Sequence, residues 1–258
     1  MVHRYALPGL GTLLLSGCSV YTPMLGVAPE IRAKGQLEAT AAWSLTNRLD
    51  VGATYSPVRH LLVRAAASTK GPLSASDSTR KYAQVNQYEL AVGTYWPLGQ
   101  RVLVGGLVAF GHSHARARYV NDDDDGYAMD PQSPTNFVQH QFEARYSKYS
   151  AEAYGRWQAT PMLGLGLSYR VVQVRLTDVT DAGVPVQAAP ILRYESMLFC
   201  RLRPAGRAAA VQLQGAIGWS SVFGPITGDD FDPARQFRLN RSYLSLGVAF
   251  DPHVLWRK

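Results

Sequence analysis

The chain has 258 residues, of which 47% are apolar and 17% charged, and no linker rich in proline, glycine and serine divides it, so we expect one large domain. Glycine (23), tyrosine (14) and tryptophan (5) are plentiful, which favours many strands over long helices. The formal net charge of +7 raises nucleic acid as a partner, but the arginines lie singly along alternating segments, which argues against nucleic-acid binding.

The beginning of the chain has the organisation of an export signal. Arg4 supplies positive charge, residues 5–15 are mostly apolar, and small residues follow. The apolar stretch is shorter than the roughly 20 residues that a membrane-spanning helix needs, so we interpret residues 1–17 as a cleaved signal peptide. The stretch Leu15–Cys18 resembles the lipobox of bacterial lipoproteins, which implies cleavage before Cys18 and addition of acyl chains to it. The alternative is an ordinary secretory signal with a chance cysteine.

Residues 18–32 carry prolines and a glycine without any periodicity. We predict that they form a lipidated tether to a folded domain of residues 33–258. The second cysteine, Cys200, lies on the apolar side of an alternating segment, and acylation of Cys18 would exclude an intramolecular disulfide. We interpret Cys200 as a small hydrophobic residue.

From Ala33 onward, apolar and polar residues alternate with period two, the pattern of half-buried strands. In the clearest segment, Val211 and Leu213 lie opposite Gln212 and Gln214. The alternation slips near residues 146–149 and again near residue 171, as bulges would cause. About ten such segments make the predicted fold class all-β: residues 36–44, 49–56, 61–70, 87–96, 101–119, 138–157, 163–170, 192–202, 211–220 and 243–250.

The connections between these segments alternate in length. Those at residues 57–60, 97–100, 160–162 and 204–206 are tight, whereas those at residues 71–81, 120–137, 178–189 and 221–239 are longer. Short turns at one end and long loops at the other are typical of outer-membrane barrels, and aromatic residues at strand ends fit the girdles of such barrels. An even number of strands predicts that both termini lie on the periplasmic, short-turn side, where lipid on Cys18 would enter the inner leaflet.

The chain resembles the small outer-membrane β-barrel proteins of Gram-negative bacteria. Its stretch from Tyr21 to Leu37 is similar to lipoprotein barrels of the Bacteroidota. The pattern Ser245-x-Gly247-x-x-Phe250 is similar to the C-terminal assembly signal of outer-membrane barrels, although residues 251–258 follow it. The resemblance implies an antiparallel up-and-down transmembrane β-barrel of about ten strands in the cell outer membrane, with membrane lipid as a partner.

Charged and hydrogen-bonding side chains lie opposite the apolar stripes in mid-strand, where a polar lumen would need them. Because buried charges must be paired, we predict that ion pairs plug the lumen and that conductance is negligible. The predicted luminal residues are Glu38, Asp50, Arg64, Glu89, His112, His114, Arg116, Glu143, Arg145, Lys148, Glu152, Arg156, Arg170, Arg193, Glu195 and Arg201.

Two motifs raise specific chemistry. Asn121, Asp123 and Asp125 have the spacing of calcium ligands in a loop that ends at Gly126, but Gln132 stands where a bidentate glutamate would be expected and no flanking helices are predicted. A solvated acidic loop is the favoured interpretation, and no other cofactor is expected.

His112 and His114 share a strand face with Arg116, an arrangement that would suit a metal or a general base. No third ligand is evident, so hydrogen bonding in the lumen is the favoured interpretation.

Three hypotheses about function follow. The favoured one is a structural or interaction barrel without enzymatic activity, whose long loops contact surface ligands or an envelope or surface protein partner. The second is a lipid-anchored soluble periplasmic β-domain that binds a small ligand, and the third is an outer-membrane enzyme, such as a hydrolase, that acts at the barrel rim. The scarcity of lysine on the polar faces favours a packed lumen over a soluble surface.

Overall fold

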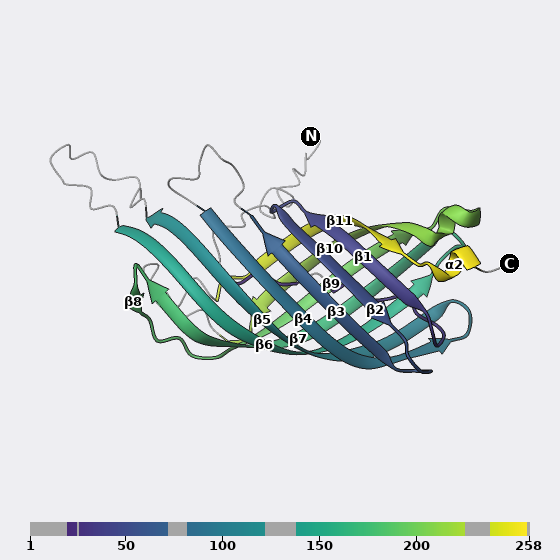
Figure 1. Ribbon diagram of the computed structural model, residues 1–258, viewed down its shortest axis with the longest axis horizontal. Coiled ribbons are helices and arrows are strands. Elements are labelled where there is room, and N and C mark those ends of the chain that lie inside the picture. Colours follow the sequence, from purple (N-terminus) through teal and green to yellow (C-terminus); the bar gives the residue numbers. More distant parts are fainter. Residues whose placement is uncertain (1–19, 25, 72–81, 122–137, 225–237, 257–258) are drawn as a thin grey trace, which may run out of the picture.

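The computed structural model describes residues 20–24, 26–71, 82–121, 138–224 and 238–256, and these form a closed antiparallel β-barrel (Figure 1). The ten strands of the wall are β1 (Leu37–Ser44), β2 (Arg48–Tyr55), β3 (Leu62–Lys70), β4 (Tyr82–Leu98), β5 (Val102–Asn121), β6 (Val138–Gln158), β7 (Leu163–Asp181), β9 (Ile191–Leu202), β10 (Val211–Val222) and β11 (Arg241–Phe250). The remaining elements are the two-residue strand β8 (Val184–Pro185), the 3₁₀ helix η2 (Gly206–Ala210) and the short helix α2 (His253–Trp256). No helix within the described ranges is long and apolar enough to cross a membrane.

The barrel has up-and-down topology. Each wall strand pairs with its neighbours in the sequence, and β1 pairs with β11 from Ala39 opposite Phe250 to Ser44 opposite Ser245, which closes the ring. The short β8 pairs with β7 and lies outside the ring. The predicted fold class and the number of about ten strands are therefore confirmed.

The two ends of the barrel differ in their connections. We call the end where residues 99–101 and 159–162 make tight connections the turn end; β1 begins there and β11 ends there. We call the opposite end the loop end. The strands are joined there by the connections at residues 71–81, 122–137, 182–190 and 223–240. The β1–β2 connection also lies at the loop end but needs only residues 45–47.

One side of the wall is much taller than the other. Strands β4 to β7 contain 17, 20, 21 and 19 residues, whereas the other six wall strands contain 8 to 12. We call β4–β7 the long wall. In Figure 1 these four strands extend farther at the loop end than the other wall strands do.

The two slips predicted in the alternation of the long wall have different outcomes. A register shift does lie next to the first one, at Arg145/Tyr146, but the extra residue is Thr177 on β7, and the inward residues of β6 keep one parity from Phe142 to Arg156. At Val171 the register is regular, so the second predicted slip is wrong. The polarity of the two faces changes there instead. Toward the loop end the inner face becomes apolar and the outer face polar, and in the sequence this exchange looks the same as a slip in the alternation.

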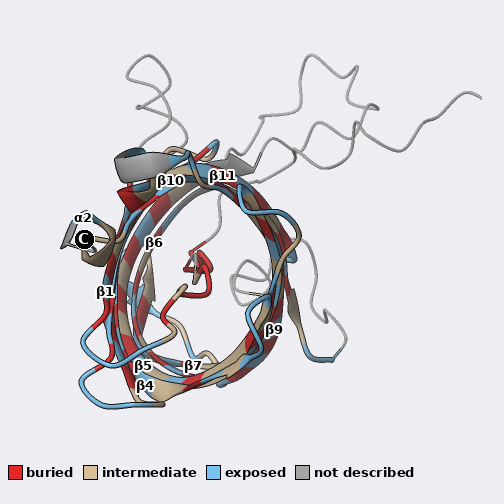
Figure 2. Ribbon diagram, turned by 90° about the vertical axis from the view of Figure 1, so that its right-hand side faces the viewer, coloured by how far each residue is buried: buried red, intermediate tan, exposed pale blue. Residues whose placement is uncertain are grey.

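The segment before the first strand runs inside the barrel. Residues 20–24 and 26–32, which we call the inner segment, are mostly buried and cross the lumen in Figure 2. Val20 packs near the loop end, whereas the Arg32 guanidinium donates to the carbonyl oxygen of Gly99 at the turn end (3.4 Å). The chain then turns at Gly35, where φ is +77°, and enters β1.

This path differs from the external tether predicted for residues 18–32. A segment that lies across a barrel lumen contacts the wall on all sides, so it has no reason to show the two-sided pattern of a strand. The predicted signal peptide and Cys18 lie outside the described residues.

Candidate functional site

The barrel interior, filled by the inner segment and by charged side chains of the wall, is the candidate functional site. A barrel of eight strands has an interior that side chains alone can fill, and 16 or more strands leave an aqueous channel. Ten strands leave room for one additional segment of chain. The contacts of that segment fall into three levels, from the loop end to the turn end.

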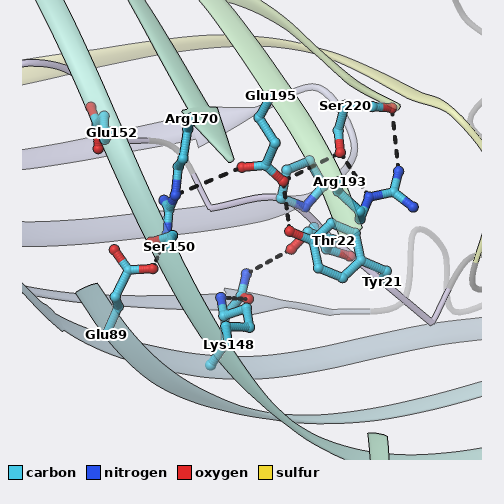
Figure 3. A network of polar contacts seen from close by, with 12 residues as sticks. Tyr21, Thr22, Glu89, Lys148, Ser150, Glu152, Arg170, Arg193, Glu195 and Ser220 are labelled. Atoms are coloured by element: carbon cyan, nitrogen blue, oxygen red, sulfur yellow. Dashed lines mark hydrogen bonds and ion pairs between the residues drawn. The ribbon is translucent and has the colours of Figure 1, made fainter. Parts of the chain in front are cut away.

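At the loop end the inner segment is held by Tyr21. Val20 and Tyr21 pack in an apolar cluster with Phe142 and other inward residues of the long wall. The Tyr21 hydroxyl donates to the Glu195 carboxylate (2.6 Å), and the Arg193 guanidinium lies over the Tyr21 ring, 4.5 Å from its centroid. Figure 3 shows this phenol beside Glu195 and Arg193 of β9.

Backbone carbonyls of the inner segment accept hydrogen bonds from the wall at the next level. Gln87 Nε2 donates to the carbonyl of Thr22 (3.2 Å), and Arg48 Nη1 donates to that of Pro23 (2.5 Å). Lys148 Nζ in turn donates to Gln87 Oε1 (2.6 Å). These polar side chains supply the partners that an extended segment without a neighbouring strand would otherwise lack.

A cluster of charges occupies the middle of the lumen. Arg64 Nη2 lies 3.0 Å from Glu152 Oε2 and 3.3 Å from Glu89 Oε1. Arg170 forms an ion pair with Glu89, and its Nη2 also donates to Ser150 Oγ (2.9 Å; Figure 3). The cluster joins β3, β4, β6 and β7 across the interior.

At the turn end the segment is held through Glu30 and Glu38. Arg201 donates from its two terminal guanidinium nitrogens to Glu38 (2.8 and 2.9 Å), and Glu38 Oε2 also accepts from the backbone N–H of Glu30 (2.8 Å). The Glu30 carboxylate forms ion pairs with Arg156 (2.5 Å) and Arg203. Forked arginine–carboxylate contacts of this kind are stronger and more directional than neutral hydrogen bonds.

The structure places most of the predicted luminal residues inside the barrel. The residues found there are Glu38, Asp50, Arg64, Glu89, Lys148, Glu152, Arg156, Arg170, Arg193, Glu195 and Arg201. Each is at most 8% exposed, and mid-strand parity alone was sufficient to predict them.

Five predicted luminal residues are wrong, because His112, His114, Arg116, Glu143 and Arg145 lie on the outer face of the long wall. Their strand neighbours Ala115, Ala117 and Ala144 are the buried, inward residues. The physical reason is that the polar face is the inner one only along the middle of the barrel; beyond it, the outer face carries the polar residues.

Other residues of the interior were missed. Tyr21 and Glu30 lie in the aperiodic inner segment, which offers no pattern to read. Arg48 has the parity of its partner Asp50, to which it donates at 2.7 Å, so extending the second alternating segment by one residue would have found it.

The outer face of the barrel carries a continuous apolar band. Large apolar side chains point outward on every wall strand, such as Leu90 (61% exposed), Val108 (58%) and Leu246 (68%). Aromatic side chains stand near both edges of the band: Trp43, Tyr88, Phe110, Tyr149, Tyr169, Tyr194 and Trp219 toward the loop end, and Tyr55, Trp96, Trp157 and Phe250 toward the turn end.

Beyond the band, the outer face of the long wall is polar. The His114 imidazole lies 2.8 Å from Glu143, and Arg116 lies 3.2 Å from the same carboxylate. Hydrogen bonds from His114 and Arg116 lower the pKa of Glu143 from its ordinary value. His112 contacts Ser147 Oγ (3.2 Å) and stands edge-on to Phe110, so the two histidines have separate partners.

The predicted calcium loop is not placed by the structure, because Asp123 and Asp125 lie outside the described residues and Asn121 ends β5. Within the described ranges, no group of three or more His, Cys, Asp or Glu residues could hold a metal ion. His112 and His114 therefore do not belong to such a group in this part of the chain, although Glu143 lies beside His114.

No protein-family model matches the chain, and no curated protein sequence matches it significantly. Among solved structures, the chain is similar to the translocator domain of the autotransporter NalP from Neisseria meningitidis (TM-score 0.44, 10% identity, 86% of this chain and 90% of that chain). It is also similar to the outer membrane protease OmpT from Escherichia coli (0.45, 8%, 84% and 93%) and to an outer membrane channel from Pseudomonas putida F1 (0.43, 10%, 88% and 100%). At these identities the likeness is one of fold alone.

Proposed function

We propose that this protein is an integral outer-membrane β-barrel with a structural or surface-interaction role. The observation that carries the proposal is the continuous apolar band on a closed ring of strands. A closed barrel satisfies its backbone hydrogen bonds internally, which is the condition for strands to lie in lipid. A soluble protein would expose an apolar surface of this kind to water at high cost, so the soluble periplasmic alternative is not favoured.

The same proposal includes a lumen that does not conduct ions. It is supported by the inner segment, which is in contact with the wall at both ends, and by paired charges between these contacts. The polar outer face of the long wall and the connections of the loop end then remain as the surfaces available to a partner. An enzymatic role at the rim has no support from the described residues.

We also propose that Cys18 is acylated. The lipobox-like stretch Leu15–Cys18 supports this part of the proposal. The apolar band would hold the barrel in the membrane independently of the lipid, so the acyl chains would be a second attachment.

Membrane fractionation tests the integral barrel. Membranes that contain the wild type or Cys18→Ala are washed with carbonate, and the retained protein is run on a gel with and without heating. We expect both proteins to stay in the membrane and to migrate differently when unheated, because the apolar band holds the barrel without the lipid. Release of the Cys18→Ala variant by the wash would overturn the proposal, since the lipid would then be the sole anchor.

A further inference from the structure

A groove of about 680 Å³ crosses the outside of the barrel. Its lining follows a register row from Leu49 on β2 through Thr69 and Asn86 to His114 on β5 and Arg145 on β6. Residues paired in this way lie side by side across neighbouring strands. The groove therefore runs around the outer wall.

The groove lies at the edge of the apolar band and has two kinds of lining. Leu49, Val51 and Tyr88 line its apolar part and are 37%, 44% and 54% exposed. Asn86, His114 and other polar side chains line the remainder. In a barrel that spans a membrane, such a boundary lies where lipid acyl chains meet headgroups, so an amphipathic lipid fits it better than a water-soluble ligand.

Arg145 lines the polar side of the groove, and further arginines lie beside it on the outer face of the long wall. The outward positions of the long wall carry Arg116, Arg118, Arg145 and Arg175, with Glu143 and Asp178 as the neighbouring carboxylates. Glu143 is engaged by Arg116 and His114, whereas Arg145 forms no ion pair with any residue that the structure describes. The Arg175 guanidinium lies over the Tyr149 ring, 5.3 Å from its centroid. Arginine in this setting recognises phosphate through its forked donors.

We propose that this groove binds a phosphorylated glycolipid of the lipid A type from the outer leaflet. The phosphate lies against Arg145, which lines the groove, and Arg175, which is paired with the lining residue Ser147. The acyl chains lie along Leu49, Val51 and Tyr88. The inference rests on the proposed function, and it takes the loop end as the side that faces the cell exterior, because outer-membrane barrels carry their longer connections on that side.

The test uses the purified full-length barrel in detergent, with bound lipid counted by native mass spectrometry. Three probes are compared: diphosphorylated lipid A, the same glycolipid without phosphates, and inorganic phosphate as a competitor. Arg145→Gln/Arg175→Gln is the test variant. Arg59→Gln/Arg101→Gln is the matched control, because it removes the same charge from exposed arginines at the turn end.

We expect the wild type and the control to bind diphosphorylated lipid A equally, and the test variant to bind it at least tenfold more weakly. Removal of the lipid phosphates should weaken binding to the wild type by a similar factor, and inorganic phosphate should not compete. Equal binding by the test variant, or equal loss in the control, would overturn the groove as the site. Competition by millimolar phosphate would instead show an anion site that does not recognise lipid.

The same samples are run on a gel with and without heating, which separates the two proposals. A heat-dependent shift in every protein without any difference in lipid binding would defeat only the groove. If the wild type showed no shift and did not stay in carbonate-washed membranes, the integral barrel itself would fail.

Discussion

Glu38 and Arg201 show how a single contact can stabilise both the wall and the inner segment. Both side chains are at most 3% exposed, and the Glu38 carboxylate also accepts from the Glu30 backbone. Removing one partner of a buried ion pair leaves the other charged and unpaired in a medium of low polarity.

We therefore expect Glu38→Gln to lower the free energy of unfolding by about 3–5 kcal/mol. The double variant Glu38→Gln/Arg201→Gln should lose less than the sum of the two single variants, because no charge is left alone. Guanidinium unfolding of the barrel in lipid vesicles, followed by tryptophan fluorescence, measures both. Strict additivity would show that the two groups do not act as a pair.

Close packing in the lumen also depends on a glycine. Gly218 on β10 lies beneath the inward ring of Tyr243, and a Cβ at this position would overlap the ring. A Cβ at Gly155 on β6 would meet nothing within 4 Å. Gly218→Ala should cost about 1–3 kcal/mol through overpacking, and Gly155→Ala should be nearly neutral. Equal midpoints in guanidinium unfolding would contradict the close packing of Tyr243.

Glu143 predicts a small pH dependence at the loop end. His114 and Arg116 lower its pKa below the ordinary value of 4.5, so the folded state favours the carboxylate. The resulting stabilisation is present above the pKa of the unfolded chain and is lost as the pH falls through the lower folded pKa. The stability difference between the wild type and Glu143→Gln should therefore shrink as the unfolding medium is changed from pH 6 to pH 3. A difference that does not depend on pH would contradict this assignment.

Among the elements, the wall strands could be predicted from the sequence and the inner segment could not. The alternation in residues 211–220 predicts correctly that one face of the strand points to lipid and the other to the lumen. This prediction is correct wherever a strand lies in the apolar band. It fails at His112 and His114, because there the outer face contacts water and the inner face packs against apolar neighbours. The residues of the inner segment contact several strands of the wall, so their burial leaves no period in the sequence.

The inner segment carries a prediction of its own. Wild-type barrel in planar bilayers should give negligible conductance, whereas a variant without residues 20–32 should give discrete channel steps, because Tyr21 and Glu30 no longer occupy the lumen. Glu30→Ala serves as a milder variant that keeps the segment in place, and it should show only brief openings. Large, steady conductance steps from the wild type would contradict a closed lumen.

At the scale of the whole molecule, the apolar band is the surface by which the barrel contacts lipid. Leu198 lies midway along β9 and is 50% exposed, whereas Leu45 is 61% exposed in the β1–β2 connection at the loop end. In lipid vesicles, Leu198→Arg should lower the free energy of unfolding by about 2–4 kcal/mol and Leu45→Arg by about 0–1 kcal/mol. Equal costs at the two positions would show that the band does not face lipid.

The position of the inner segment also has a consequence for how the ring closes. It occupies a ring whose closing ladder, from Ala39 opposite Phe250 to Ser44 opposite Ser245, joins the first wall strand to the last. Once that ladder has formed, the segment has no lateral way in and would have to thread through the lumen. A segment that docks before this ladder forms needs no threading, because the ring then closes around it. The same ladder keeps the segment from leaving sideways once the first and last strands have paired.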